Sequence, residues 1–258
     1  MSVLDSIIDG VREDLAQRRL PLSQLHEKLA QAPTVIDAHE RLLAAPMTII
    51  AEVKRSSPSK GALATIENPA SLAARYEVAG AAVVSVLTEK RRFGGSLEDL
   101  VAVRSAIEIP ILRKDFMVDE YQFYEARAHG ADVVLLIVAA LSKNQLKDYY
   151  DLATELGMAV LVETHTEQEI EDAMAINPRI VGVNARNLKT LDIDLTAFAR
   201  LLPMIPTDVI RVAESGISQR SEVEIAQAAG AQAILVGETL VKSGDPREAI
   251  DQLLGRTK

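Results

Sequence analysis

Eight short apolar runs recur along the chain, and a segment with helical periodicity follows each of them. Buried parallel strands have this appearance because both of their faces pack against apolar neighbours. A helix between two such strands is the usual crossover connection of a parallel sheet. Eight successive strand–helix units therefore predict a closed (β/α)8 TIM barrel, an α/β fold. The expected strands are Thr48–Val53, Ala82–Leu87, Pro110–Arg113, Val133–Val138, Ala159–Val162, Ile180–Val183, Val209–Ala213 and Ala233–Val236.

The helical segments carry end signals of their own. Four of them end in Gly just before a strand, as is typical of a left-handed C-cap. An open, doubly wound sheet is the alternative fold, but its usual G-x-G-x-x-G turn after the first strand is missing. The expected helices are Ser71–Val78, Leu97–Ile107, Glu120–His129, Asn144–Leu156, Glu167–Ile176, Leu195–Leu201, Arg220–Ala229 and Arg247–Leu254.

A length of 258 residues suits one closed barrel, so we expect a single domain. Residues 1–45 would form an N-terminal helical extension of about two helices, interrupted at proline, and residues 46–258 the barrel. The extension has an apolar stripe that must cover something, and the open mouth of the barrel is the expected target. Packing on the bottom or flank is the alternative. The stripe consists of Val3, Ile7, Ile8 and Val11.

The composition excludes several classes of protein. The net charge is −9, whereas a broad nucleic-acid surface needs a basic field. The chain has no Cys, which excludes disulfides and thiolate metal sites. No apolar run is long enough to span a membrane, and residues 1–18 lack the apolar core of a signal peptide. The absence of Cys also fits a cytoplasmic protein. We expect no metal or organic cofactor, because the histidines are scattered: His26, His39, His129 and His165.

Charged and amide side chains follow most of the expected strands directly. The active sites of closed barrels lie at the carboxyl ends of the strands, so these side chains are expected to meet. Glu52 and Lys54 are two residues apart and therefore point the same way, and Asn184 and Arg186 do so for the same reason. An acid–base pair of lysine and glutamate is the central prediction. The candidate catalytic residues are Lys114, Glu163, Lys54, Glu52, Asn184 and Glu214.

Small residues follow the last two strands, where barrels often bind phosphate. Ser215-Gly216 and Gly237-Glu238 can bring backbone N–H groups close to an anion, and Ser57 can complete the site. The carboxylate of Glu238 would repel phosphate if it pointed inward. Basic residues in the other loops at this end of the barrel can steer an anionic ligand to the mouth. They are Lys54, Arg55, Lys60, Lys90, Arg91, Arg92, Arg113, Lys114, Arg186 and Lys189.

Several motifs, in the same order along the chain, resemble those of the indole-3-glycerol-phosphate synthase family. They cover residues from about 47 to 245, and the helical extension fits as well. The matching segments are Glu52-Val-Lys-Arg-Ser-Ser-Pro-Ser59, Phe93-Gly-Gly-Ser96, Leu112-Arg-Lys-Asp-Phe116, Leu161-Val-Glu163, Gly182-Val-Asn-Ala-Arg186, Ala213-Glu-Ser-Gly216 and Leu235-Val-Gly237.

The resemblance implies a lyase of tryptophan biosynthesis, a carboxy-lyase. Its reaction would be ring closure, decarboxylation and dehydration of 1-(2-carboxyphenylamino)-1-deoxy-D-ribulose 5-phosphate to indole-3-glycerol phosphate. Lys114 would be the acid of ring closure, a role that suits a lysine with a lowered pKa. Glu163 and Lys54, the latter held by Glu52, would serve in dehydration.

The resemblance also implies binding roles for the remaining candidates. Asn184 would bind a sugar hydroxyl, Glu214 would orient the sugar, and Arg186 would hold the carboxylate of the substrate. The phosphate pocket would consist of Ser57, Ser215, Gly216, Gly237 and Glu238. The pocket of the aromatic ring would consist of Phe93, Phe116, Leu135 and Leu188.

Three alternatives remain on the same fold. A sugar-phosphate isomerase such as phosphoribosylanthranilate isomerase would need an acid–base Cys, which this chain lacks. A Schiff-base aldolase would use Lys54 or Lys114 as a nucleophile. A non-catalytic phosphate-binding barrel would have no need of Glu163. In the favoured interpretation the ligand is a small phosphorylated molecule, and the protein is a monomer that could associate with other enzymes of the tryptophan pathway.

Overall fold

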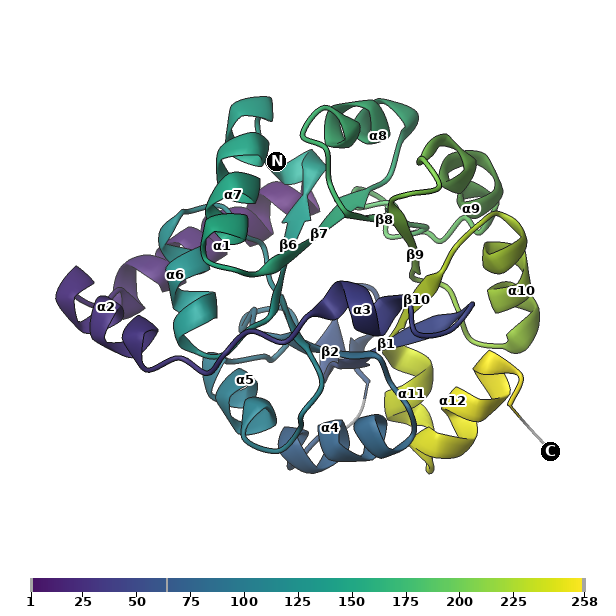
Figure 1. Ribbon diagram of the computed structural model, residues 1–258, viewed down its shortest axis with the longest axis horizontal. Helices are drawn as coiled ribbons and strands as arrows, with labels where there is room; N and C mark the ends of the chain where they lie inside the picture. The colour runs from purple at the N-terminus through teal and green to yellow at the C-terminus, as the bar shows by residue number, and fades with distance from the viewer. Residues whose placement is uncertain (1, 64, 257–258) are drawn as a thin grey trace.

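The computed structural model describes residues 2–63 and 65–256 of the chain and confirms the expected (β/α)8 barrel. Eight parallel strands close in the order β1-β10-β9-β8-β7-β6-β5-β4, so that the first and last strands are neighbours. Helices surround the sheet (Figure 1). The barrel strands are β1 Thr48–Val53, β4 Val83–Leu87, β5 Ile111–Lys114, β6 Val133–Ile137, β7 Ala159–Thr164, β8 Ile180–Asn184, β9 Ile210–Glu214 and β10 Ala233–Val236.

The expected helices are all present, with ends close to those predicted. The largest shift is in α5, which ends at Arg104, although the buried Ile107 continues the apolar spacing into the following loop. The outer helices are α4 Pro69–Val78, α5 Leu97–Arg104, α6 Tyr121–Ala128, α7 Lys143–Glu155, α8 Glu167–Met174, α9 Thr196–Leu201, α10 Arg220–Ala228 and α12 Pro246–Leu254. Short elements that the sequence did not predict are the hairpin β2 Ser56–Ser57 and β3 Gly61–Ala62, helix α11 Glu238–Lys242, and 3-10 turns η1 Val138–Ala140 and η2 Leu202–Met204.

Side-chain alternation along the strands creates two apolar cores. In β1, Ile49, Ala51 and Val53 pack outward against the helices, whereas Ile50 points into the barrel. The same rule holds around the sheet, so the barrel interior is packed with aliphatic side chains. Its inward residues include Leu112, Val133, Leu135, Leu161, Ile180, Ile210, Val212, Ala233 and Leu235.

The N-terminal extension forms three helices, and they cover both ends of the barrel. The last of them, α3 Ala38–Leu42, lies across the amino end, where the Thr48 hydroxyl donates to the Leu42 carbonyl at 3.0 Å. The first, α1 Val3–Arg18, packs its apolar stripe on the opposite end beside Phe116. Between them, α2 Leu22–Ala30 lies against α6. The mouth and the bottom are therefore each covered by a different helix.

No helix within the described part of the chain is both long enough and apolar enough to cross a lipid bilayer.

Leu42→Ala should lower the free energy of unfolding by about 2–5 kcal/mol, because it leaves a cavity beneath the barrel. Leu42 is 2% exposed, whereas the neighbouring Leu43 is 54% exposed and provides a matched control. Leu43→Ala should change the free energy of unfolding by about 0.5 kcal/mol or less. Urea denaturation of both variants measures the difference. Equal destabilisation would show that α3 does not seal the barrel.

Candidate active site

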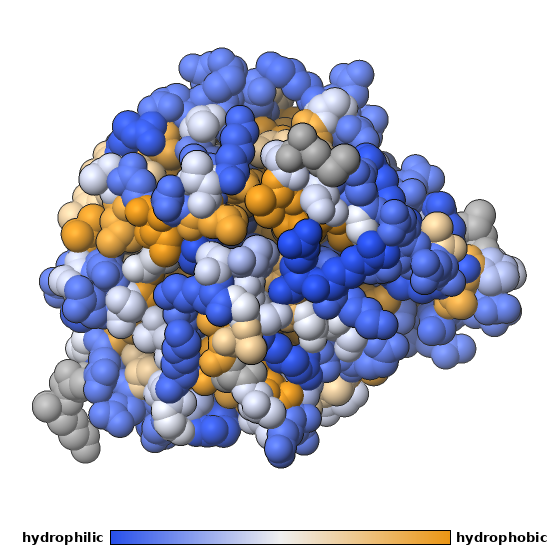
Figure 2. Space-filling model, turned by 180° about the vertical axis from the view of Figure 1, so that it is seen from behind, coloured by the Kyte–Doolittle hydropathy of each residue, from blue (hydrophilic) through white to orange (hydrophobic). Residues whose placement is uncertain are grey.

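A cavity of 580 Å³ opens at the carboxyl end of the barrel, beneath α1. Figure 2 views the molecule from this end and shows a band of apolar side chains crossing the face beside polar ones. The structure brings all of the residues that the sequence suggested for a site to this one cavity. They are Glu52, Lys54, Ser57, Phe93, Lys114, Phe116, Leu135, Glu163, Asn184, Arg186, Leu188, Glu214, Ser215, Gly216, Gly237 and Glu238.

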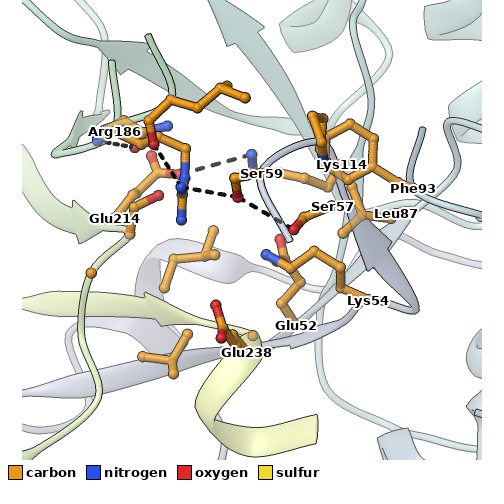
Figure 3. Close-up of a pocket in the computed structure, with 18 of the residues that line it drawn as sticks. Glu52, Lys54, Ser57, Ser59, Leu87, Phe93, Lys114, Arg186, Glu214 and Glu238 are labelled. Carbon is orange, nitrogen blue, oxygen red and sulfur yellow. Dashed lines mark hydrogen bonds and ion pairs between the residues drawn. The ribbon is translucent and has the colours of Figure 1, made fainter. Parts of the chain in front are cut away.

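Strand parity explains why these side chains meet. The inward row of β1 begins with Ile50 and continues to Glu52 and Lys54, and that of β5 runs from Leu112 to Lys114. Each row is apolar in the middle of the barrel and becomes polar at its carboxyl end. Figure 3 shows Lys54, Lys114 and Arg186 approaching the same cavity from different strands.

A cluster of ionic contacts lies at the base of the cavity. The Lys114 Nζ atom lies 3.3 Å from Glu163 Oε2 and 4.0 Å from Glu214 Oε2. On β1, the Lys54 Nζ atom lies 2.6 Å from Glu52 Oε1. All three carboxylates are buried, so they lack the hydration that would otherwise stabilise their charge. The lysines replace that hydration.

The pKa of Lys114 is raised, contrary to the expectation of a lowered one. Burial alone would lower it, but the negative charges of Glu163, Glu214 and Glu52 outweigh the loss of hydration. The prediction was wrong because it considered burial without the carboxylates of other strands. Lys114 is therefore an ammonium ion at neutral pH and can donate a proton.

The two carboxylates beside Lys114 differ in their ionisation. Burial favours protonation of Glu163, but the charges of Lys114 and His165 overcome it and lower the pKa of this carboxyl. Burial and the negative charge of Glu163 instead raise the pKa of Glu214 well above its usual range. Neighbouring carboxyl groups with opposite pKa shifts are typical of sites that carry out acid–base chemistry.

Gly182 makes room for Glu214. A Cβ atom at position 182 would overlap the Glu214 carboxyl group, which reaches across from the next strand. Glu214 Oε1 is buried and has no hydrogen-bond partner within residues 2–63 and 65–256. This oxygen packs against the Gly182 backbone, so the Glu214 carboxyl group is buried in the barrel wall at the base of the cavity.

The loop after β9 has a backbone shape that suits an anion. Ser215 and Gly216 both have positive φ angles, of 67° and 76°. Consecutive left-handed residues turn their N–H groups to one side, and a non-glycine residue in this conformation is strained. Strain of this kind is concentrated at functional sites.

Two lysines offset the repulsion that the Glu238 carboxylate would exert on a phosphate group. Lys60 Nζ and Lys242 Nζ each lie 2.7 Å from Glu238 Oε1. Although partial burial opposes it, these two contacts lower the pKa of Glu238 and neutralise its charge. Because two lysines surround one carboxylate, this rim of the cavity carries a net positive charge.

Arg186 joins two loops across the mouth. Its Nη1 donates to Ser59 Oγ at 3.1 Å and to the Leu191 carbonyl at 3.0 Å (Figure 3). Its backbone N–H donates to Asn184 Oδ1 at 2.9 Å. The guanidinium is fixed at the cavity and retains donors for a carboxylate or phosphate.

The cavity wall that faces these polar and charged groups is apolar. The rings of Phe93 and Phe116 lie 6.1 Å apart, tilted by 41°, and Leu135 and Leu188 lie near them. This wall is continuous with β6, whose carboxyl end carries no charged group. Helix α1 extends it with three further aliphatic side chains, Val3, Leu4 and Ile7.

Comparison with known proteins decides the family. The family model for indole-3-glycerol phosphate synthase matches residues 4–253. Curated relatives with that name include one from Micrococcus luteus, 57% identical, with 97% of this chain and 96% of the relative covered. Another, from Rhodococcus jostii, is 55% identical, with 98% and 95% covered.

The chain belongs to the indole-3-glycerol phosphate synthase family.

Solved structures agree with the barrel fold. A 3-hexulose-6-phosphate synthase matches with a TM-score of 0.66 at 16% identity, covering 83% of this chain and 100% of that one. A thiamine phosphate pyrophosphorylase from Pyrococcus furiosus matches with a TM-score of 0.61 at 13% identity, covering 84% and 96%. At such identities the similarity concerns the fold alone.

Some predicted contributors to a basic mouth in this synthase-family chain prove to be elsewhere. Arg113 points outward from β5 and is fully buried, with Nη2 3.0 Å from Asp115 Oδ2 and 2.9 Å from Glu125 Oε2. Arg91 is paired with α1, with Nη2 2.7 Å from Asp14 Oδ1. Arg55 is paired with Asp99. These arginines support the barrel wall and hold helix α1 in place, and they add little charge to the cavity.

Sequence reasoning missed His165, which follows β7 immediately. Its Nε2 atom lies 3.4 Å from Glu163 Oε1, on the side of that carboxylate away from the cavity. Strand parity would have pointed His165 into the cavity with Glu163, and the structure does not place it there, so its position directly after β7 was its one sequence signal. Within the described residues, no group of three or more His, Asp or Glu side chains has an arrangement that could hold a metal ion.

Proposed function

We propose that this chain catalyses the indole-3-glycerol phosphate synthase reaction, with Lys114 as the acid of ring closure. One observation carries the proposal: a buried ammonium ion lies 3.3 Å from Glu163 at the base of a cavity with one apolar and one polar wall. The substrate has the same division, with an aromatic ring at one end and a sugar phosphate at the other.

The charge state of Lys114 matches the first step. As the ring carbon that bears the carboxylate attacks the ketone, the ketone oxygen becomes a hydroxyl and needs a proton. Lys114 would supply it, because the surrounding carboxylates keep this lysine protonated and it lines the cavity. Loss of CO2 then leaves its bonding electrons in the new ring.

Dehydration needs a base for the proton that leaves and an acid for the departing hydroxyl. Glu163, which is ionised, suits the base, and Lys54, held by Glu52, suits the acid. Glu214 and Asn184, which both line the cavity, would orient the sugar hydroxyls.

The two walls of the cavity would fix the substrate at its ends. Arg186 would bind the carboxylate, and the ring would lie against the apolar wall formed by Phe93, Phe116, Leu135 and Leu188. The phosphate would bind near the backbone of Ser215, Gly216, Gly237 and Glu238, beside Ser57 and within the positive field of Lys60 and Lys242. All these groups come from one chain, so we also propose a monomer. We propose that it acts in the cytoplasm and could associate with other enzymes of tryptophan synthesis.

The Schiff-base aldolase on this fold is less well supported. A lysine nucleophile must lose its proton, whereas the carboxylates around Lys114 hold that proton. Incubation with the carboxyphenylamino deoxyribulose phosphate separates the two functions. Appearance of indole fluorescence supports the synthase. A borohydride-trapped covalent adduct without indole would support the aldolase, and binding without either would contradict both.

Lys114→Met should reduce turnover by about 10²–10⁴, the usual contribution of a general acid, while substrate binding stays nearly unchanged. Lys143→Met is the matched control, because the Lys143 side chain is exposed on α7. Glu163→Gln, which keeps the size but exchanges no proton, should cause a loss of the same order. Single-turnover rates are compared with binding titrations. A loss of less than about tenfold would assign Glu163 a purely electrostatic role.

Removal of residues 1–20 should leave a folded barrel whose KM is roughly tenfold higher, since a contact of about 1.4 kcal/mol is worth that factor. The cavity then loses the side chains of α1. Point variants refine the test: Ile7 lines the cavity, whereas the equally buried Ile8 does not. Ile7→Ala should raise KM, and Ile8→Ala should only lower the melting temperature. A truncated protein with unchanged KM would show that α1 is not part of the site.

A further inference from the structure

A buried carboxyl group organises the turn between β4 and α5. Glu89 lies just beyond the end of β4 and is 3% exposed. Its Oε1 accepts the backbone N–H of Arg91 at 2.9 Å, and its Oε2 accepts those of Arg92 and Phe93 at 2.7 and 3.0 Å. The Glu89 carbonyl accepts the Gly95 N–H at 2.9 Å. The side chain and the backbone of one residue therefore fix the shape of the whole turn.

The turn carries part of the apolar wall of the cavity. Phe93 lines the cavity, and its ring lies 6.1 Å from that of Phe116. It also packs against the apolar cluster that includes Leu4 and Ile7 of α1. Because the Phe93 N–H is bound by Glu89, the buried carboxyl group determines where this ring enters the cavity.

The same turn holds the helix that covers the cavity. Arg91 Nη2 lies 2.7 Å from Asp14 Oδ1, and Arg91 Nη1 lies 2.8 Å from Glu13 Oε2. Arg92 Nη2 donates to Ser6 Oγ at 3.1 Å. Positions 6 and 13 are two helical turns apart and share one face of α1. Two adjacent arginines thus hold this face, while the apolar stripe of the helix packs on the barrel.

A glycine inside α1 fits this arrangement. Glycine is unfavourable in the interior of a helix, because it loses more conformational freedom on folding than alanine does. A Cβ atom at Gly10 would lie 3.1 Å from Arg91 Cδ and 3.3 Å from Arg91 Nη1, closer than ordinary van der Waals contact. The missing side chain lets Arg91 lie directly against α1, so the helix and the turn are fitted to each other.

We propose that Glu89 is a positioning residue for the aromatic end of the substrate. It does not line the cavity, and it acts through Phe93 and through the side chains that α1 supplies there. The inference rests on the proposed function for the identity of the ring. Lys114 and Glu163 are positioned by β5 and β7, so the effect of Glu89 concerns binding of the ring and leaves the acid–base pair in place.

Glu89→Gln tests this role in steady-state kinetics. The amide keeps the size of the side chain but replaces one acceptor oxygen by a donor, so at least one of the three N–H groups loses its partner. KM should rise by about tenfold, the factor for one lost contact of ordinary size, while kcat stays within about threefold of the wild type. Glu98→Gln, exposed in the first turn of α5, is the matched control and should change neither constant.

Fluorine NMR reports the position of the ring without turnover. The chain has four Phe residues, so labelling with 4-fluorophenylalanine gives four ¹⁹F signals, which single Phe→Leu changes assign. In Glu89→Gln the signals of Phe93 and Phe116 should shift or broaden. Those of Phe123 and Phe198, fully buried on α6 and α9, should keep their positions.

Arg91→Met replaces Glu89→Gln if circular dichroism shows that the latter does not fold, because the Arg91 side chain is exposed. It should raise KM by about threefold or more by releasing α1. The inference is contradicted if KM of the folded variant stays within about twofold of the wild type, if kcat falls by about tenfold, or if all four ¹⁹F signals move together. If the wild type forms no indole, the proposed function fails, and the ¹⁹F comparison still decides whether Glu89 positions Phe93.

Discussion

The attraction between one buried ammonium ion and the carboxylates around it determines the chemistry of this barrel. Lys114 and Glu163 are both almost removed from water, and neither could remain charged in this position without the other. Glu214 shares the same lysine at a longer distance and is pushed toward its neutral form. These two contacts thus hold an ammonium ion, an ionised carboxylate and a carboxyl group of raised pKa within one small volume.

Strand alternation allows this cluster to exist in an otherwise aliphatic core. The inward rows are apolar from the bottom of the barrel to its middle, where Leu161, Ile180 and Val212 fill the interior. One residue further on the same face, the rows reach Glu163 on β7 and Glu214 on β9. The rigid sheet that forms the core therefore also sets the spacing of the reactive groups.

The sequence predicted what depends on short-range periodicity. Spacing along the chain gives the strand runs, the helix ends and the common face of Glu52 and Lys54. These signals were enough to predict that the proposed site residues meet in one cavity. The direction of the Lys114 pKa shift was not predictable in this way, since it depends on carboxylates from other strands. The same holds for the pairing of Glu238 with Lys60, which joins residues far apart in the sequence. Arg113 was wrongly assigned to the cavity, although strand alternation along β5 already places it on the opposite face from Lys114.

The central claim is that carboxylates keep Lys114 charged despite its burial. Titration of the Lys114 side chain by NMR, with ¹³C and ¹⁵N labels at Cε and Nζ, tests it most directly, and Lys114→Met assigns the signal. The account predicts that Lys114 stays protonated beyond the pH at which exposed lysines, with a pKa of about 10.4, lose half of their protons. A Lys114 signal that titrates below the exposed lysines would show that burial outweighs the carboxylates, and would contradict the account.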